Sequence, residues 1–165
     1  MFVCQCGEMK FVPFRCKSRF CPTCGNMYSI DRTTSMSFKL LHCVHRHCVF
    51  TIPEELRQLF LDDRTLLDCL FRAVNDVISL LFLRVNKTTP FTPAFLCVLH
   101  TFGRDLKWNP HIHSLISEGG VNDDGFWRKV PHFNFNFLRH SFQTALLKQL
   151  HLLLGASFIP LKSLL

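Results

Sequence analysis

The sequence predicts an α+β protein with a small metal-stabilised module at its N-terminus, and three observations lead to this class. Five cysteines fall within the first 24 residues, in a segment poor in aliphatic side chains. Further along, β-prone runs are followed by apolar residues at three- and four-residue spacing, which is typical of helices with one buried face. A chain of 165 residues has room for such a module and one compact core.

The N-terminal module contains a zinc knuckle, Cys21-Pro22-Thr23-Cys24-Gly25. Two residues between thiolates let both sulfurs reach one tetrahedral ion, and the glycine allows a tight backbone turn. The other ligands of the zinc ion come from three upstream cysteines. We favour the ligand set Cys6, Cys16, Cys21 and Cys24, and Cys4 is an alternative to one of the upstream ligands. We therefore expect a zinc-ribbon-like domain over residues 1–30.

Basic residues lie between and beside these cysteines, namely Arg15, Lys17 and Arg19. They either contact phosphate or remain solvated surface charge. Residues 31–47 are expected to form a linker. We interpret its histidines, His42, His45 and His47, as part of a basic approach to the first strand, able to touch DNA, rather than as a second metal site.

The expected second domain covers residues 48–165. A β-prone run over 48–52 ends at Pro53, where proline followed by Glu54 and Glu55 predicts the start of a helix. A second helix carries one apolar stripe, made of Leu66, Leu67, Leu70, Phe71, Val74, Val77, Ile78 and Leu81. A polar connection over 86–93 leads to a hairpin, with strands over 94–102 and 111–117 joined by 103–110. The residues over 118–120 and 122–125 predict turns, and a last helix is expected over 137–154.

The returning strand of this hairpin carries the most informative pattern, His111-Ile112-His113. Because side chains alternate along a strand, both imidazoles share one face, where they can hold a divalent metal, while Ile112 points into the hydrophobic layer. If the hairpin is symmetric about Leu106 and Lys107, His100 falls opposite His113 and becomes a third ligand or a supporting group. A slip of one residue would remove His100 from that face.

Composition indicates the partners and the compartment. Nineteen basic against twelve acidic side chains give a net charge of +7, which favours a polyanion such as DNA or RNA, and Lys107 is a further candidate for contact with DNA. The nine cysteines are odd in number and no signal peptide precedes them, which favours a reducing, cytoplasmic setting. The cysteines outside the module, Cys43, Cys48, Cys69 and Cys97, are then small core residues. No apolar run is long enough to predict a membrane span.

Several blocks of the sequence closely resemble rolling-circle insertion-sequence transposases of the two-tyrosine, HUH type. The blocks are Cys16-Lys17-Ser18-Arg19-Phe20-Cys21-Pro22-Thr23-Cys24-Gly25, Val49-Phe50-Thr51-Ile52-Pro53-Glu54-Glu55-Leu56, Leu99-His100-Thr101-Phe102-Gly103, Asn109-Pro110-His111-Ile112-His113 and Gly119-Gly120. They occur in the same order as in that family and span nearly the whole chain. The resemblance implies a zinc-binding domain that helps recognise element ends, followed by a partial HUH nuclease domain built on an antiparallel sheet with flanking helices.

The resemblance also implies a chemistry. His111 and His113 match the HUH pair and would bind Mg²⁺ or Mn²⁺ at the scissile phosphate of single-stranded DNA. In such enzymes a tyrosine on a helix attacks this DNA. Here the single tyrosine, Tyr28, lies just after the zinc knuckle. We therefore expect a truncated transposase that lacks its nucleophile and binds metal and DNA without cutting.

Two other functions compete with this interpretation. One is a stand-alone zinc-dependent DNA-binding or regulatory protein without catalytic activity. The other is a metal hydrolase that uses His100, His111 and His113, which is weakened because the nearby acids, Asp105 and Glu118, lie in expected turns. Among the aromatic residues, Trp108, Trp127 and Phe133 are candidates for stacking on unpaired bases.

Overall fold

The computed structural model describes residues 2–11, 15–85, 89–155 and 158. Its contacts separate the chain into two compact units, an N-terminal unit, Met1–Leu40, and a C-terminal unit, Leu41–Leu165. The linker expected over 31–47 covers the second half of a helix and the first residues of a strand, and the two units meet between Leu40 and Leu41.

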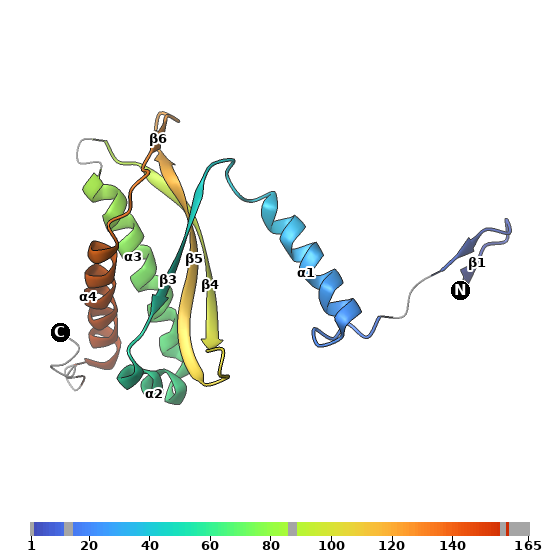
Figure 1. Ribbon diagram of the computed structural model, residues 1–165, viewed down its shortest axis with the longest axis horizontal. Helices are drawn as coiled ribbons and strands as arrows, with labels where there is room; N and C mark the ends of the chain where they lie inside the picture. The colour runs from blue at the N-terminus through green and yellow to red at the C-terminus, as the bar shows by residue number, and fades with distance from the viewer. Residues whose placement is uncertain (1, 12–14, 86–88, 156–157, 159–165) are drawn as a thin grey trace. The chain divides into compact units, whose positions relative to one another are not determined.

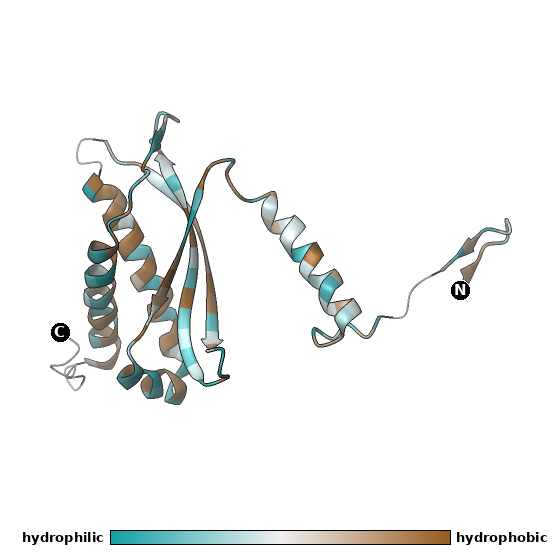
Figure 2. Cartoon of the chain, viewed as in Figure 1, coloured by the Kyte–Doolittle hydropathy of each residue, from teal (hydrophilic) through white to brown (hydrophobic). Residues whose placement is uncertain are grey.

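The N-terminal unit consists of a short antiparallel hairpin and one helix (Figure 1). Strands β1 (Phe2–Val3) and β2 (Met9–Lys10) form the hairpin, and α1 spans Pro22–Ser37. None of the 16 residues of α1, all of which the structure describes, is buried. Figure 2 accordingly shows α1 mostly in hydrophilic and intermediate colours. Because most helical stability in proteins comes from packing of a buried face, α1 gains little stability from packing.

The C-terminal unit is an antiparallel sheet with helices packed on one side of it (Figure 1). The sheet has the order β3-β5-β4, and β6 pairs with the far end of β5. Its strands are β3 (His45–Thr51), β4 (Thr92–Phe102), β5 (Trp108–Val121) and β6 (Trp127–Lys129). The helices are α2 (Glu54–Asp62), a 3₁₀ turn η1 (Arg64–Leu66), α3 (Leu67–Val85) and α4 (Phe135–Leu154). The α+β class predicted from the sequence is confirmed.

The core lies between the helices and the inner face of the sheet. Helix α3 buries a continuous stripe that includes most of the predicted residues, and in Figure 2 its brown stretches alternate with paler and teal ones. The sheet contributes Phe50 from β3 and Ile112 and Ile116 from β5, the last two with no exposed surface. Alternation then turns their neighbours on β5 toward the opposite, outer face. This outer face carries His111 and His113.

The register of the hairpin differs from the predicted one by two residues. His100 pairs with His111, and Val98 pairs with His113. The predicted symmetry about Leu106 and Lys107 is wrong because the loop closes earlier, with Gly103 donating its N–H to the Lys107 carbonyl, 2.9 Å away. The pairing then shifts by one residue between Phe102 and His100, which leaves the total difference at two. Since the shift is an even number, His100 stays on the face of His111 and His113.

Element boundaries also differ where the sequence predicted turns. The segment Glu118-Gly119-Gly120 is part of β5, whereas a turn was expected. A Cβ atom at Gly119 would lie 2.6 Å from the carbonyl oxygen of Arg128, and one at Gly120 would lie 2.8 Å from that of Thr92. The two glycines are therefore strand residues that let the neighbouring strands approach closely.

Candidate metal centres

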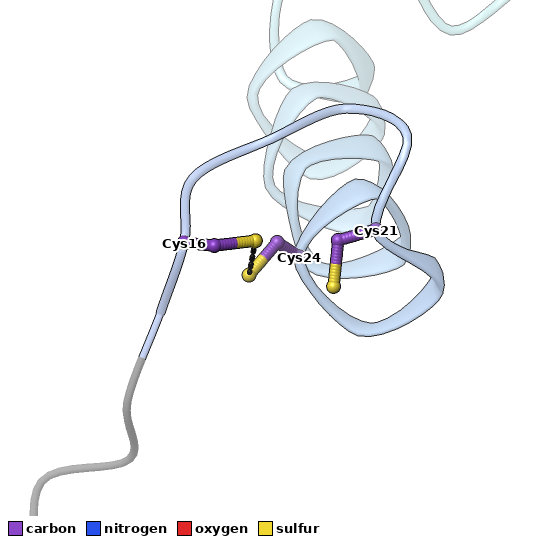
Figure 3. A group of neighbouring side chains, drawn as sticks. All are labelled: Cys16, Cys21 and Cys24. Atoms are coloured by element: carbon purple, nitrogen blue, oxygen red, sulfur yellow. Dashed lines mark hydrogen bonds between the residues drawn. The ribbon is translucent and has the colours of Figure 1, made fainter.

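Three thiols gather where the N-terminal loop meets α1 (Figure 3). The Sγ atoms of Cys16, Cys21 and Cys24 all lie within 4.8 Å of one another, and those of Cys16 and Cys24 are 3.6 Å apart. Cys21 is the N-cap of α1, Cys24 lies in its first turn, and Cys16 comes from the preceding loop. A tetrahedral zinc with Zn–S bonds of about 2.3 Å would place its sulfurs about 3.8 Å apart. The group therefore fits three of the four ligands of such an ion.

The backbone around this group explains the glycine that follows the second cysteine. The N–H of Gly25 donates to the Cys21 carbonyl at 2.7 Å, and a Cβ atom at Gly25 would lie 2.5 Å from the Arg19 carbonyl oxygen. Close approach of the loop, rather than a tight turn, thus requires glycine here. The N–H of Cys24, the Cys16 thiol and the N–H of Thr23 lower the pKa of the Cys21 thiol, which favours the thiolate that binds metal.

The remaining two cysteines of the predicted set lie in the turn between β1 and β2. The Cys4 carbonyl accepts a hydrogen bond of 2.9 Å from the N–H of Gly7, whose φ is +84°. A hydrogen bond from the Cys4 side chain lowers the pKa of the Cys6 thiol. Among the described residues, Cys4 and Cys6 form a pair apart from the three gathered thiols.

The basic residues of the N-terminal unit are all exposed. Arg15 and Lys17 flank Cys16, and Lys17 has a left-handed backbone with φ of 58°. Arg19 instead contacts the single tyrosine, since its guanidinium lies 4.7 Å from the centre of the Tyr28 ring and its Nη2 donates to the hydroxyl at 3.2 Å. Tyr28 is therefore a packing partner of Arg19 in this structure.

The outer face of the sheet brings together three imidazoles. His100 on β4 and His111 and His113 on β5 each offer a ring nitrogen, and these atoms lie within 4.8 Å of one another. The ring centres of His100 and His113 are 4.2 Å apart, and those of His111 and His113 are 5.0 Å apart. Fully buried Ile112 anchors the strand from the inner side, which turns both of its neighbours outward. The structure thus brings together the predicted pair and the predicted third residue.

The surroundings of His111 and His113 bear on how each ring could bind a metal. Nδ1 of His111 lies 2.6 Å from the Asn109 carbonyl, so this nitrogen donates and Nε2 remains free as a ligand. Burial, followed by the charges on His100, His111 and His47, lowers the pKa of His113. A neutral imidazole carries the lone pair that a metal ion needs.

A fourth histidine belongs to this cluster, and the sequence analysis missed it. Nε2 of His47 lies 2.8 Å from Nδ1 of His113, and the two rings are nearly parallel, with centres 5.0 Å apart. His47 belongs to β3, so the interpretation of His45 and His47 as linker residues is wrong. Alternation along His45, His47, Val49 and Thr51 was the available signal, but only the pairing of β3 with β5 shows which residue they face.

The two acids considered for hydrolysis lie elsewhere. Asp105 is exposed in the hairpin loop, with an oxygen 3.7 Å from Nζ of Lys107, which is itself 82% exposed. Glu118 was expected to be a solvated turn residue, but its side chain is only 11% exposed and it binds the guanidinium of Arg46. This ion pair joins β3 to β5. In the part of the chain that the structure describes, no carboxylate is grouped with the three histidines.

Two of the aromatic residues considered for base stacking are engaged in the fold. Phe133 is fully buried, and the indole N–H of Trp108 donates to the Arg57 carbonyl at 2.9 Å. Trp127 is 42% exposed.

Three of the four cysteines outside the module have the expected place in the core. Cys48 and Cys69 are buried, and Cys97 packs against the core and donates to the Ser114 hydroxyl at 3.4 Å. Cys43 is only half-buried, with Sγ 3.9 Å from Nε2 of His45, so its expected place in the core is wrong. Within the described ranges, no helix is both long and apolar enough to span a bilayer.

Comparison with known families matches both units. Residues 1–52 match the family "Transposase zinc-binding domain", and residues 94–164 match the family "Putative transposase". The transposase for insertion sequence element IS801 of Pseudomonas savastanoi pv. phaseolicola is 34% identical over 126 residues, which are 76% of this chain and 30% of that protein. A second relative, "Putative transposase y4qJ" of Sinorhizobium fredii, is 30% identical over 73% of this chain and 30% of its own length. The chain thus spans about a third of the length of these relatives.

Among solved structures, most of this chain shares its fold with a conjugative relaxase. The metal-bound structure of the relaxase TrwC in complex with oriT DNA has a TM-score of 0.50 at 18% identity, covering 71% of this chain and 46% of the relaxase. The metal-free structure of the same complex gives a TM-score of 0.50 over 72% of this chain and 48% of the relaxase. With both family matches and a relaxase-like fold in place, the chain belongs to the rolling-circle insertion-sequence transposases that carry an N-terminal zinc-binding domain.

Proposed function

We propose that the C-terminal unit binds a divalent cation through His100, His111 and His113 and presents it to the backbone of single-stranded DNA from insertion-sequence ends. The observation that carries this proposal is the gathering of three imidazoles from two adjacent strands on the outer face of the sheet. A metal bound there would polarise a phosphodiester oxygen and stabilise the charge that develops during displacement. The net charge of +7 and the DNA bound to the relaxase of the same fold support a DNA partner.

The donor set bears on which cation binds. Mg²⁺ prefers oxygen ligands and releases its water reluctantly, whereas imidazole nitrogen suits transition metals. Of the two ions expected from the sequence, Mn²⁺ therefore fits the three histidines better than Mg²⁺. A titration with each ion should show tighter binding of Mn²⁺, and loss of that binding in His111→Ala.

The N-terminal unit is proposed to hold a structural zinc and to contact the same DNA. Cys16, Cys21 and Cys24 would supply three thiolates, and Cys6 or Cys4 would supply the fourth. Four basic residues are proposed to contact phosphate. They are Arg15 and Lys17 beside the thiols, Arg19, which contacts Tyr28, and exposed Lys107 in the hairpin loop.

We further propose that this chain binds DNA without cutting it. The single tyrosine, Tyr28, lies in the N-terminal unit against Arg19, whereas the histidines belong to the C-terminal unit. The C-terminal unit therefore brings a metal site but no tyrosine of its own to the phosphate.

Anisotropy of a labelled single-stranded oligonucleotide, taken from the DNA flanking the coding sequence, tests these proposals. We expect binding that strengthens with Mn²⁺, loses this enhancement in the double variant His111→Ala and His113→Ala, and weakens as salt rises. A covalent DNA adduct on Tyr28, or nicking that requires His111, would overturn the claim that the chain does not cut.

The same measurement distinguishes the transposase proposal from a second candidate function, that of a zinc-dependent DNA-binding or regulatory protein. It is favoured by the position of the only tyrosine outside the histidine-bearing unit. Under that function, binding survives loss of both histidines and is unaffected by Mn²⁺, but fails in Cys21→Ser. Dependence on both sites would support the transposase proposal instead.

A further inference from the structure

The imidazole of His47 lies far in sequence from the segments that carry His100, His111 and His113. It comes from β3, on the side of β5 opposite the strand that carries His100. Val49 is directly paired with His113, and His47 lies two residues earlier on the same face, paired with Leu115. His47 is thus a diagonal neighbour of His113, a separation that an imidazole can bridge.

The contact between the two rings has the geometry of a hydrogen bond between nearly coplanar rings. Nε2 of His47 is 2.8 Å from Nδ1 of His113, with the planes inclined by 17°. One of these two nitrogens must carry the proton. If Nδ1 of His113 donates to the lone pair on Nε2 of His47, then Nε2 of His113 is left with a free lone pair. If the proton sits on His47 instead, Nε2 of His113 carries a hydrogen and cannot bind a metal.

His111 shows the same arrangement with a different acceptor. Its Nδ1 donates to the backbone carbonyl of Asn109 at 2.6 Å. Both histidines of the pair are therefore held at Nδ1 by a nearby group, which leaves Nε2 on each ring for a metal. Hydrogen bonds of this kind fix ring orientation and tautomer at metal sites.

We propose that His47 is a positioning residue of the metal centre, accepting the Nδ1–H of His113 and so presenting Nε2 of His113 to the cation. His47 itself carries its proton on Nδ1 and does not bind the ion. The inference rests on the proposed metal centre, which it deepens by naming the group that orients one ligand.

The side chain can be replaced without disturbing the core. His47 is exposed, and it borders a groove of about 540 Å³ between β3 and α4, lined among others by Phe50, Leu138 and Phe142. A glutamine at this position keeps an acceptor oxygen close to the place of Nε2, whereas alanine removes it. His45 offers a matched control, because it lies on the same strand and face, but its Nε2 is near Cys43.

The test measures Mn²⁺ binding to the full chain by calorimetry, with circular dichroism to verify folding. We expect His47→Ala to weaken binding roughly tenfold or more, the range found for groups that orient a ligand. His47→Gln should recover most of the affinity, and His45→Ala should match the wild type. Long-range ¹H–¹⁵N spectra should show His113 protonated at Nδ1 in the wild type and a mixture of tautomers in His47→Ala.

Failure of this inference is distinguishable from failure of the metal centre. If the wild type binds Mn²⁺ and loses it in His113→Ala, but folded His47→Ala binds as tightly as the wild type, the positioning role is refuted and the centre stands. If the wild type itself binds no Mn²⁺, both are refuted. A proton on Nε2 of wild-type His113 would also refute the positioning role.

Discussion

Replacing Ile112 by alanine tests the geometry on which the metal centre depends. Ile112 has no exposed surface and lies in the core, between two histidines that face outward. The change removes three carbon atoms, each worth about 0.8 kcal/mol of burial. The cavity left behind adds to this, so we expect the free energy of unfolding of the C-terminal unit to fall by about 3–4 kcal/mol, within the range of about 2–5 kcal/mol typical of such changes.

Urea denaturation followed by tryptophan fluorescence is a suitable assay, because both tryptophans, Trp108 and Trp127, lie in the C-terminal unit. Ile112→Val should cost only about 1 kcal/mol. Val98→Ala is the control from the outer face, since Val98 is 44% exposed and pairs with His113, and it should cost about 0.5 kcal/mol.

Equal losses for Ile112→Ala and Val98→Ala would refute the reasoning. Such a result would mean that Ile112 does not point into the core. The alternation that places His111 and His113 together on the outer face would then have no support.

Three further predictions follow from the structure. Gly25→Ala should weaken zinc binding, measured by competition with a chromogenic chelator, because its Cβ would lie 2.5 Å from the Arg19 carbonyl oxygen; unchanged zinc affinity would contradict the close approach. Glu118→Gln should destabilise the C-terminal unit by about 1–3 kcal/mol in urea, since it leaves the half-buried Arg46 without its charged partner, and a loss below about 0.5 kcal/mol would show that the pair is dispensable. Burial raises the pKa of the Cys48, Cys69 and Cys97 thiols above their ordinary value of 9.0. The free energy of unfolding should therefore be unaffected by these thiols below pH 8 and should decline as the pH rises past 9. The same thiols should resist iodoacetamide at pH 8.5 until urea is added. Alkylation of these thiols in the folded chain at the rate seen in urea would contradict their burial.

Much of the site could be predicted because its chemistry is local in sequence. Cys21 and Cys24 are separated by two residues, and this short spacing brings their sulfurs together whatever the rest of the chain does. His111 and His113 share a face through strand alternation alone. The stripe on α3 could be predicted for the same reason, since the period of a helix fixes which residues are neighbours.

The rest of the site depends on pairing between segments distant in sequence. His100 reaches the centre through a register that differs from the predicted one by two residues, and only because this difference is an even number did the prediction place His100 on the correct face. His47 and His113 are 66 positions apart and meet only because β3 adds to the edge of β5. No periodicity within either segment could have indicated this contact.

The sequence by itself determined that this chain has a thiol site around Cys21 and Cys24 and a pair of imidazoles on one face of a strand, because both depend on spacing within a single segment. Tertiary structure alone decided that His47 touches His113, that Glu118 holds Arg46 across two strands, and that Gly119 and Gly120 lie within β5 rather than in a turn. The physical reason is that register and the close approach of backbones are set by packing of the whole sheet against its helices, which a local pattern does not contain.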